Sequence, residues 1–280
     1  TNATRFIYHT IHEFPINSFV VSDIHGHVLS IPLVHLTIAF LINLFFERKI
    51  KIREILILSF LLSLLYMTNA WDSIIYFGLS LFVIFILIKI NESKNLVKSV
   101  LKTGGFTLLI IVFFILFSLP FNQNFSPFAS QIGIVCPPKF LTNIGNIGPL
   151  IFAGDACQKS PIWQVLILFG FFLFFIVSYC FTLLKAKKIS NADHLVLILI
   201  FFSGLLIISP ELFYLKDIYS GHFRANTMFK LFYQAFIILG VICSYMIAKT
   251  FTNFNSITKR RVFKFVFLIF SLVLFSLISI

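Results

Sequence analysis

The chain has 280 residues, of which 59% are hydrophobic and only 11% are charged. Soluble domains average about 45–50% apolar and about 25% charged residues, so this composition excludes an ordinary water-soluble protein. A net charge of +12 can indicate a nucleic-acid-binding protein. Here the basic residues flank apolar runs, which favours a membrane protein and excludes nucleic acid as a partner.

Eight apolar runs are candidates for membrane spans, which need about 20 residues each. We expect an all-α, polytopic transmembrane helix bundle of about eight spans, in which residues 1–280 form a single transmembrane domain. Several runs are short, so we expect those helices to be tilted or to continue into their flanks. The runs are residues 31–46, 53–68, 73–90, 103–119, 162–184, 194–209, 228–249 and 263–280.

The distribution of lysine and arginine predicts the orientation. Sixteen of the 22 lie in the first, third, fifth and seventh connections between the runs. Basic connections are typically cytoplasmic and contact anionic lipid head groups. We therefore expect a multi-pass protein of the cell membrane whose other connections lie on the outer face. The chain starts at Thr1 without a signal peptide, and we expect it to be a fragment of a longer protein.

The outer loop 120–161 is rich in proline and glycine but also contains large apolar residues, among them Phe121, Phe125, Phe128, Phe140, Leu141, Ile151 and Phe152. Its apolar content argues against disorder, and we expect it to pack on the membrane surface or over a cavity. Cys136 and Cys157 both lie in this loop on the oxidising side. A disulfide and two free thiols are equally compatible with the sequence.

The first candidate site surrounds Asp23, His25 and His27, with Glu13 shortly before them. Ionisable groups at the mouth of a membrane helix are functional candidates because they are costly there. If the segment is helical, Asp23 and His27 share a face, and if it is extended all three residues do. Carboxylate and imidazole suit a divalent metal ion, held by Asp23 and His27, or general acid–base chemistry. The alternative is a capped helix start with interfacial histidines.

Two further motifs fall on the same predicted face. Arg224, Asn226 and Lys230 begin an apolar run and are candidate phosphate ligands, although Glu211 or Asp217 are possible structural ion-pair partners. The other motif contains Asn69, Trp71 and Asp72, and with Asp217 from the previous motif these are candidates for binding or supporting an acceptor. Alternatively, Trp71 is an interfacial anchor and Asp72 caps a helix.

These motifs resemble the YYY-type integral membrane protein family of archaea and bacteria. The matching stretches are residues 11–15 with 18–19, then 23–29, 68–72, 216–217 and 224–230, whereas the Tyr-Tyr-Tyr motif itself is absent. The family is similar to the GT-C membrane glycosyltransferases, which take a sugar from a polyprenyl-phosphate carrier at the outer membrane face. The resemblance implies a GT-C-like fold and a catalytic acid in the first outer loop, which we expect to lie in the N-terminal part outside this fragment.

The sequence thus favours a glycosyltransferase with membrane lipids and a polyprenyl-phosphate sugar as partners. In this interpretation Asp23, His25, His27 and Glu13 are catalytic, whereas Arg224, Lys230 and Asn226 bind the donor phosphate. The alternatives are a lipid or solute transporter or flippase, and a non-catalytic membrane subunit. A non-catalytic subunit predicts that the three motifs are scattered in space, whereas an enzyme predicts that they converge.

Overall fold

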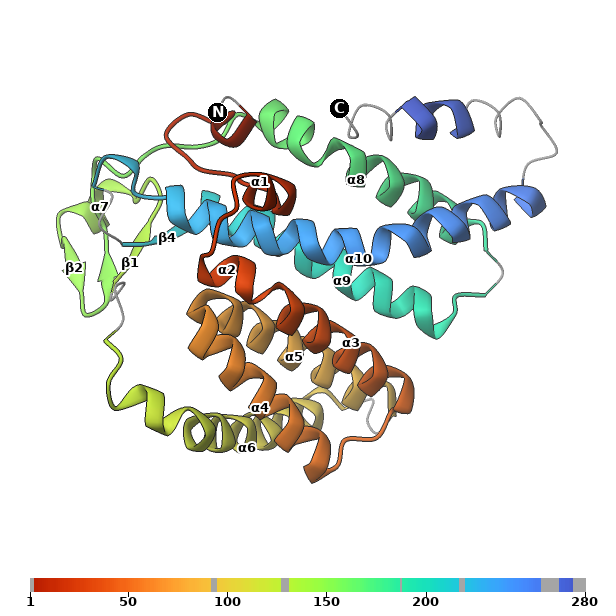
Figure 1. Cartoon of the computed structure of the whole chain (residues 1–280), viewed down its shortest axis with the longest axis horizontal. Helices are drawn as coiled ribbons and strands as arrows, with labels where there is room; N and C mark the ends of the chain where they lie inside the picture. Colours follow the sequence, from red (N-terminus) through yellow and green to blue (C-terminus); the bar gives the residue numbers. More distant parts are fainter. Residues whose placement is uncertain are drawn as a thin grey trace. The chain divides into compact units, whose positions relative to one another are not determined.

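The structure is a computed structural model, described here for residues 3–91, 95–126, 131–186, 188–216, 220–257 and 267–273. These residues are mainly helical (Figure 1), because in lipid only a helix or a closed barrel satisfies every backbone polar group. The α-helices are α1 Pro15–Val20, α2 Gly26–Leu29, α3 Ile31–Glu47, α4 Ile52–Thr68, α5 Ala70–Asn91, α6 Leu96–Asn122, α7 Lys139–Thr142, α8 Ile162–Leu184, α9 Asn191–Ile208 and α10 Ala225–Ile257. The strands are β1 Ile132–Ile134, β2 Asn146–Ile147, β3 Leu150–Ile151 and β4 Phe213–Leu215. The 3₁₀ helices are η1 Ala3–Arg5, η2 Ser209–Glu211 and η3 Ser220–His222.

Seven of the eight predicted spans coincide with the helices α3, α4, α5, α6, α8, α9 and α10. In the eighth, only residues 267–273 are described, and they are helical. Within the described residues, six segments are long and apolar enough to cross a membrane: Gly26–Glu47, Ala70–Asn91, Leu96–Asn122, Ile162–Leu184, Asn191–Glu211 and Ala225–Thr252. The 17 residues of α4 span about 26 Å at ~1.5 Å per residue, slightly less than the bilayer core. The prediction of a polytopic helical membrane protein is confirmed.

The chain divides into two compact units. Unit 1 contains Thr1–Lys159 and Gly204–Gln234, and unit 2 contains Ser160–Ser203 and Ala235–Ile280. The helices α9 and α10 therefore each contribute to both units. That residues 1–280 form one transmembrane domain stays a prediction.

In unit 1, α4 packs against α3, α5 and α6, and α3 also contacts α5. The core between them is formed by fully buried aliphatic side chains, among them Val34, Leu58 and Leu79. At one end of these helices, Asn91 Nδ2 donates a hydrogen bond of 2.7 Å to the carbonyl oxygen of Arg48. Lys102 lines the same small cavity as Arg48 and Asn91. The basic ends of α3, α5 and α6 are therefore gathered together.

At the opposite end of α4, α2 rests directly on the end of that helix. A Cβ added to Gly26 would lie only 2.4 Å from the carbonyl oxygen of Thr68, so glycine is required for this close approach. Ser30, at the junction of α2 and α3, hydrogen-bonds to Asp72 in the first turn of α5. The first and third sequence motifs thus meet at the end of the helices that lacks the basic connections.

Part of the predicted outer loop forms a small folded module in unit 1. Its sheet has the order β2-β3-β1-β4, with β1 parallel to β3 and antiparallel to β4. A disulfide joins Cys136 and Cys157, which decides between the two alternatives that the sequence left open. Val135, Ala156 and Tyr214 form the core of the module. Because Tyr214 belongs to β4, the module is fastened to the chain that leads into α10.

Unit 2 is held together at one end by a buried carboxylate. Asp193 is fully buried, and one of its oxygens accepts hydrogen bonds of 2.9 Å from the hydroxyls of Tyr179 and Tyr245. The other oxygen accepts from Ser190 Oγ at 2.6 Å and lies 3.4 Å from Lys249 Nζ. This network links α8, α9 and α10 within unit 2 and leaves the carboxylate fully paired.

Candidate functional site

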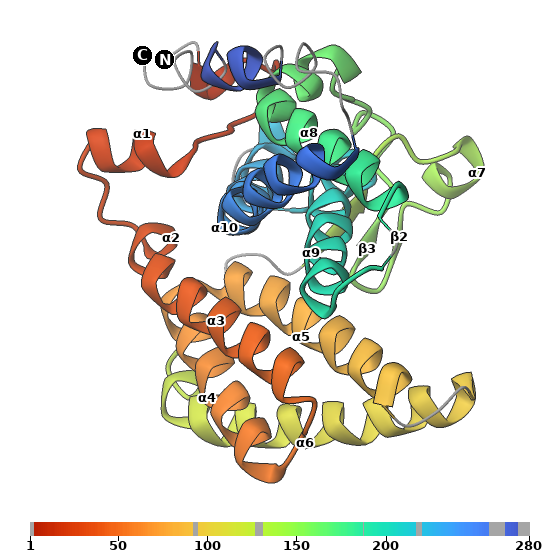
Figure 2. The same cartoon turned by 90° about the vertical axis from the view of Figure 1, so that its right-hand side faces the viewer.

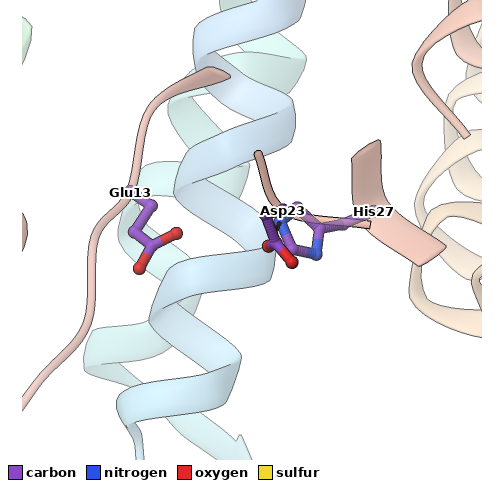
Figure 3. A group of neighbouring side chains, drawn as sticks. All are labelled: Glu13, Asp23 and His27. Atoms are coloured by element: carbon purple, nitrogen blue, oxygen red, sulfur yellow. Dashed lines mark ion pairs between the residues drawn. The ribbon is translucent and has the colours of Figure 1, made fainter. Parts of the chain in front are cut away.

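Glu13, Asp23 and His27 form a compact cluster in unit 1 (Figure 3). One potential ligand atom from each residue lies within 4.8 Å of the others. Glu13 precedes α1, whose first residue is Pro15, a proline position that suits a helix start. The chain then reverses at Ser22, which has a positive φ of 55°, and it enters α2 at Gly26. This reversal brings Asp23 and His27 back toward Glu13.

Asp23 contacts both imidazole rings of the motif. Its Oδ2 lies 3.3 Å from Nε2 of His27, and its Oδ1 accepts a hydrogen bond from Nδ1 of His25. The hydrogen bond from His25 lowers the pKa of Asp23 below its ordinary value, because it stabilises the charged carboxylate. The segment before α2 is a turn, and through it both histidines reach the same carboxylate.

His27 is held by aromatic residues of α10. Its ring meets Phe229 edge-on at 4.8 Å between centroids, and Tyr233 at 5.2 Å. Its Nε2 also lies 3.4 Å from Oγ of Ser18 in α1. The residue is 4% exposed, and its Nδ1 is buried without a hydrogen-bond partner in the described part of the chain. By contrast, the side chain of His25 is 78% exposed.

Lys230 brings the second motif to the cluster. Its ammonium group lies 4.8 Å from the ring centroid of Phe229 and interacts electrostatically with Asp72, Asp23 and Glu13. Asn226, one turn earlier in α10, is half-buried. Lys230 is half-buried and is the positive charge among these three carboxylates, so it is a candidate for balancing the charge of an anionic group bound at the cluster.

Arg224 is placed differently from Lys230. It is 1% exposed, and its Nη1 donates a hydrogen bond of 2.8 Å to Oε1 of Glu211. Burial lowers the pKa of the Arg224 guanidinium, and the charge of Glu211 counteracts this shift. This contact agrees with the alternative in which Arg224 forms a structural ion pair with Glu211. Asp217, the other partner considered, lies outside the described residues.

Asp72, from the third motif, is at the centre of a buried polar network. It is 1% exposed, its Oδ2 accepts from Ser30, and its Oδ1 accepts from Gln234 Nε2 at 2.7 Å. Gln234 Oε1 in turn accepts a hydrogen bond of 2.9 Å from the hydroxyl of Tyr76. The network connects the junction of α2 and α3 with α5 and the first part of α10. Both oxygens of Asp72 are therefore engaged within the protein.

The remaining residues of the third motif support this arrangement. Asn69 ends α4 in an extended conformation, and its carbonyl oxygen accepts a hydrogen bond of 3.0 Å from the backbone of Asp72. Trp71 is half-buried in the first turn of α5. Sequence reasoning did not single out Tyr76, although it lies four residues after Asp72 and so shares its helix face. Ser18 lies in one of the stretches that carry the family resemblance, but neither Ser18 nor Ser30 was assigned a role, because a single serine has no distinctive chemistry in a sequence.

The donor set of the cluster fits a divalent cation. Two carboxylates supply the oxygen ligands that hard cations prefer, and an imidazole nitrogen suits manganese, zinc and iron. The three converging side chains, with Nε2 of His27 3.3 Å from Oδ2 of Asp23, are compatible with metal ligation. The same groups can also transfer protons, since an imidazole paired with a carboxylate is a common acid–base unit.

Comparison with known proteins identifies the family but not an activity. A family model described as "Uncharacterized membrane protein (DUF2298)" matches residues 1–194 and 182–239. No curated protein and no solved structure matches the chain. The two matched segments together cover most of the chain, including the cluster, Asp72 and Lys230. The chain therefore belongs to the DUF2298 family of membrane proteins.

Proposed function

We propose that this protein is a membrane glycosyltransferase that takes a sugar from a polyprenyl-phosphate donor at the outer face of the cell membrane. The observation that carries the proposal is the convergence of Glu13, Asp23 and His27 with Lys230, since the ligand atoms of the first three lie within 4.8 Å and the lysine interacts with both carboxylates. Residues from distant parts of the sequence thus place potential metal ligands beside the positively charged side chain of Lys230. A lipid phosphate needs this combination when it leaves, because its charge must be compensated.

In this proposal Glu13, Asp23 and His27 would hold a divalent cation, which would supply positive charge beside the leaving lipid phosphate. His25 orients Asp23 through its hydrogen bond. Lys230 contributes a further positive charge on the α10 side of the cluster, and Asn226 lies one helical turn away.

The other candidate residues have supporting roles in the proposal. Asp72 is buried and hydrogen-bonded at both oxygens, so it positions helices rather than a sugar acceptor. Asn69 and Trp71 belong to the same helix junction. Arg224 stabilises the segment before α10 through Glu211, and Lys230 therefore carries the phosphate role that the sequence assigned to both cations.

The test uses the full-length protein in liposomes with polyprenyl-phosphate-linked hexoses that carry a radiolabelled sugar, and with a membrane extract that supplies hydroxyl acceptors. The bond between sugar and phosphate breaks, the sugar is bonded to an acceptor oxygen, and the hydroxyl proton passes to solvent. We expect the parent protein to release polyprenyl phosphate and to transfer the label to the acceptor. Asp23→Ala, His27→Ala and Lys230→Ala should each reduce turnover by roughly 10- to 150-fold, since a hydrogen bond to a charged group contributes about 1.5–3 kcal/mol. His35→Ala is the matched control, because His35 is exposed on α3 and bonds only its own helix backbone.

Binding of Mn²⁺, measured by electron paramagnetic resonance, tests the metal role separately. Asp23→Ala and His27→Ala should lose Mn²⁺ binding, whereas His35→Ala should retain it. Full turnover by folded Asp23→Ala and His27→Ala proteins would refute the assigned site. If the parent releases no polyprenyl phosphate from any hexose donor, the glycosyltransferase assignment itself is wrong.

A further inference from the structure

The short helix α1 presents an apolar face to its surroundings. Ile16, Phe19 and Val20 are 69%, 62% and 76% exposed, and their spacing of i, i+3 and i+4 places them on one side of the helix. The surface continues along the chain with Val21 at 62% and Ile24 at 82% exposure. Contiguous exposed apolar surface of this kind marks an interaction site.

The opposite side of α1 is polar and faces the cluster. Ser18 is fully buried, and its Oγ lies 3.4 Å from Nε2 of His27. Residues 15–22 include no charged side chain. The helix is therefore amphipathic: its polar side contacts the site, and its apolar side is left uncovered by the described residues of unit 1.

The place of α1 in the chain identifies what covers the apolar side. Figure 2 shows the chain passing from α1 through a short link into α2 and α3, which form the candidate span Gly26–Glu47. On that span, Leu29 and Leu36 are 57% and 54% exposed, as expected of lipid-facing residues. The exposed apolar series that begins in α1 reaches Ile24, five positions before Leu29, so the apolar surface leads into a membrane span.

We propose that α1 is seated in the boundary between lipid head groups and acyl chains, with Ile16, Phe19 and Val20 in contact with the acyl chains. Amphipathic helices at such boundaries bury their apolar face about 5–10 Å deep. The polar face, with Ser18, then holds His27 and Asp23 at the level of the lipid phosphates. The seating follows from the surface of α1 alone and does not depend on the proposed glycosyltransferase activity.

The experiment measures the depth of residue 19 in a bilayer. A Phe19→Trp variant of the full-length protein is reconstituted into liposomes whose lipids carry bromine at shallow or deep acyl positions. The quenching of the added tryptophan is obtained by difference from the parent, which contains Trp71 and Trp163. Asn143→Trp, at an exposed position of the disulfide-closed module, is the matched control. Acrylamide quenching reports the accessibility of each tryptophan to water.

We expect the tryptophan of Phe19→Trp to be quenched by brominated lipids at a depth of about 5–10 Å, with the shallow bromines more effective. The tryptophan of Asn143→Trp should be quenched by acrylamide and much less by the lipids. Acrylamide quenching of Phe19→Trp without lipid quenching would overturn the proposal, because α1 would then lie in water. Protection from both quenchers would also overturn it, because protein would then cover the apolar face.

Discussion

Replacing Gly26 with alanine should disturb both the stability of unit 1 and the geometry of the cluster. The new methyl group would lie 2.4 Å from the carbonyl oxygen of Thr68, whereas ordinary van der Waals contact begins at 3.4 Å. The obstacle is a backbone atom, so no side-chain rotation can relieve the contact. Relief requires a displacement of about 1 Å between α2 and the end of α4.

The magnitude follows from two opposing terms. Forced overpacking costs typically 1–3 kcal/mol, whereas alanine in place of glycine in a helix contributes about 0.5–1 kcal/mol of stability. The net loss is therefore at most about 2.5 kcal/mol, which lowers the midpoint of thermal unfolding by up to roughly 10 °C for a protein of this size. His27 is the next residue, so the same displacement also moves a ligand of the cluster.

The assay compares thermal unfolding in detergent and Mn²⁺ binding for Gly26→Ala and the parent protein. Gly104→Ala is the matched control, because an added Cβ there meets no atom within 4 Å. We expect Gly104→Ala to unfold at the same or a slightly higher temperature than the parent protein and to bind Mn²⁺ equally well. The reasoning is refuted if Gly26→Ala unfolds at the same temperature as Gly104→Ala and binds Mn²⁺ equally well.

Three further predictions address the buried networks and the orientation. Tyr76→Phe removes the hydroxyl that donates to Gln234 and should cost about 1 kcal/mol, seen as a lower unfolding midpoint. Asp193→Asn removes the charge opposite Lys249 and disturbs a fully paired network, so unit 2 should lose about 1–3 kcal/mol, measured in the same assay. A membrane-impermeant maleimide should label Asn143→Cys in intact cells and should not label Lys51→Cys, and the reverse pattern would overturn the orientation.

The helices of this protein were predictable because their sequence signal is redundant. Long apolar runs indicate membrane helices wherever backbone groups must be satisfied without water. The apolar run at residues 103–119 was shorter than a membrane span. The helix α6 extends over Leu96–Asn122, in agreement with the expectation that short runs continue into their flanks. The four short strands gave no comparable signal, because two or three residues are too few to show alternation. One of them, β4, comes from more than 60 residues beyond β1.

The sequence predicted which residues belong to the candidate site better than it predicted the role of each residue. Charged residues beside membrane helices are rare enough to be noticed, and this led to Glu13, Asp23, His27, Asp72 and Lys230. Whether a carboxylate is exposed to a substrate or buried in a network depends on tertiary packing. Asp72 is enclosed by residues of three helices, and no local spacing reveals the bond to Gln234, which lies 162 positions away.

Two independent physical rules support the same orientation for unit 1. The basic ends of the helices meet where Asn91 bonds Arg48, and basic connections favour the cytoplasm. The helix α6 runs from Leu96, near that end, to residues beside the last turns of α4, where Phe121 lies 5.5 Å from Tyr66. The chain continues from there to the module closed by Cys136 and Cys157, and disulfides persist on the oxidising side. Charge and redox chemistry are unrelated, and both rules favour the prediction that the end with Gly26, Thr68 and the cluster lies on the outer face.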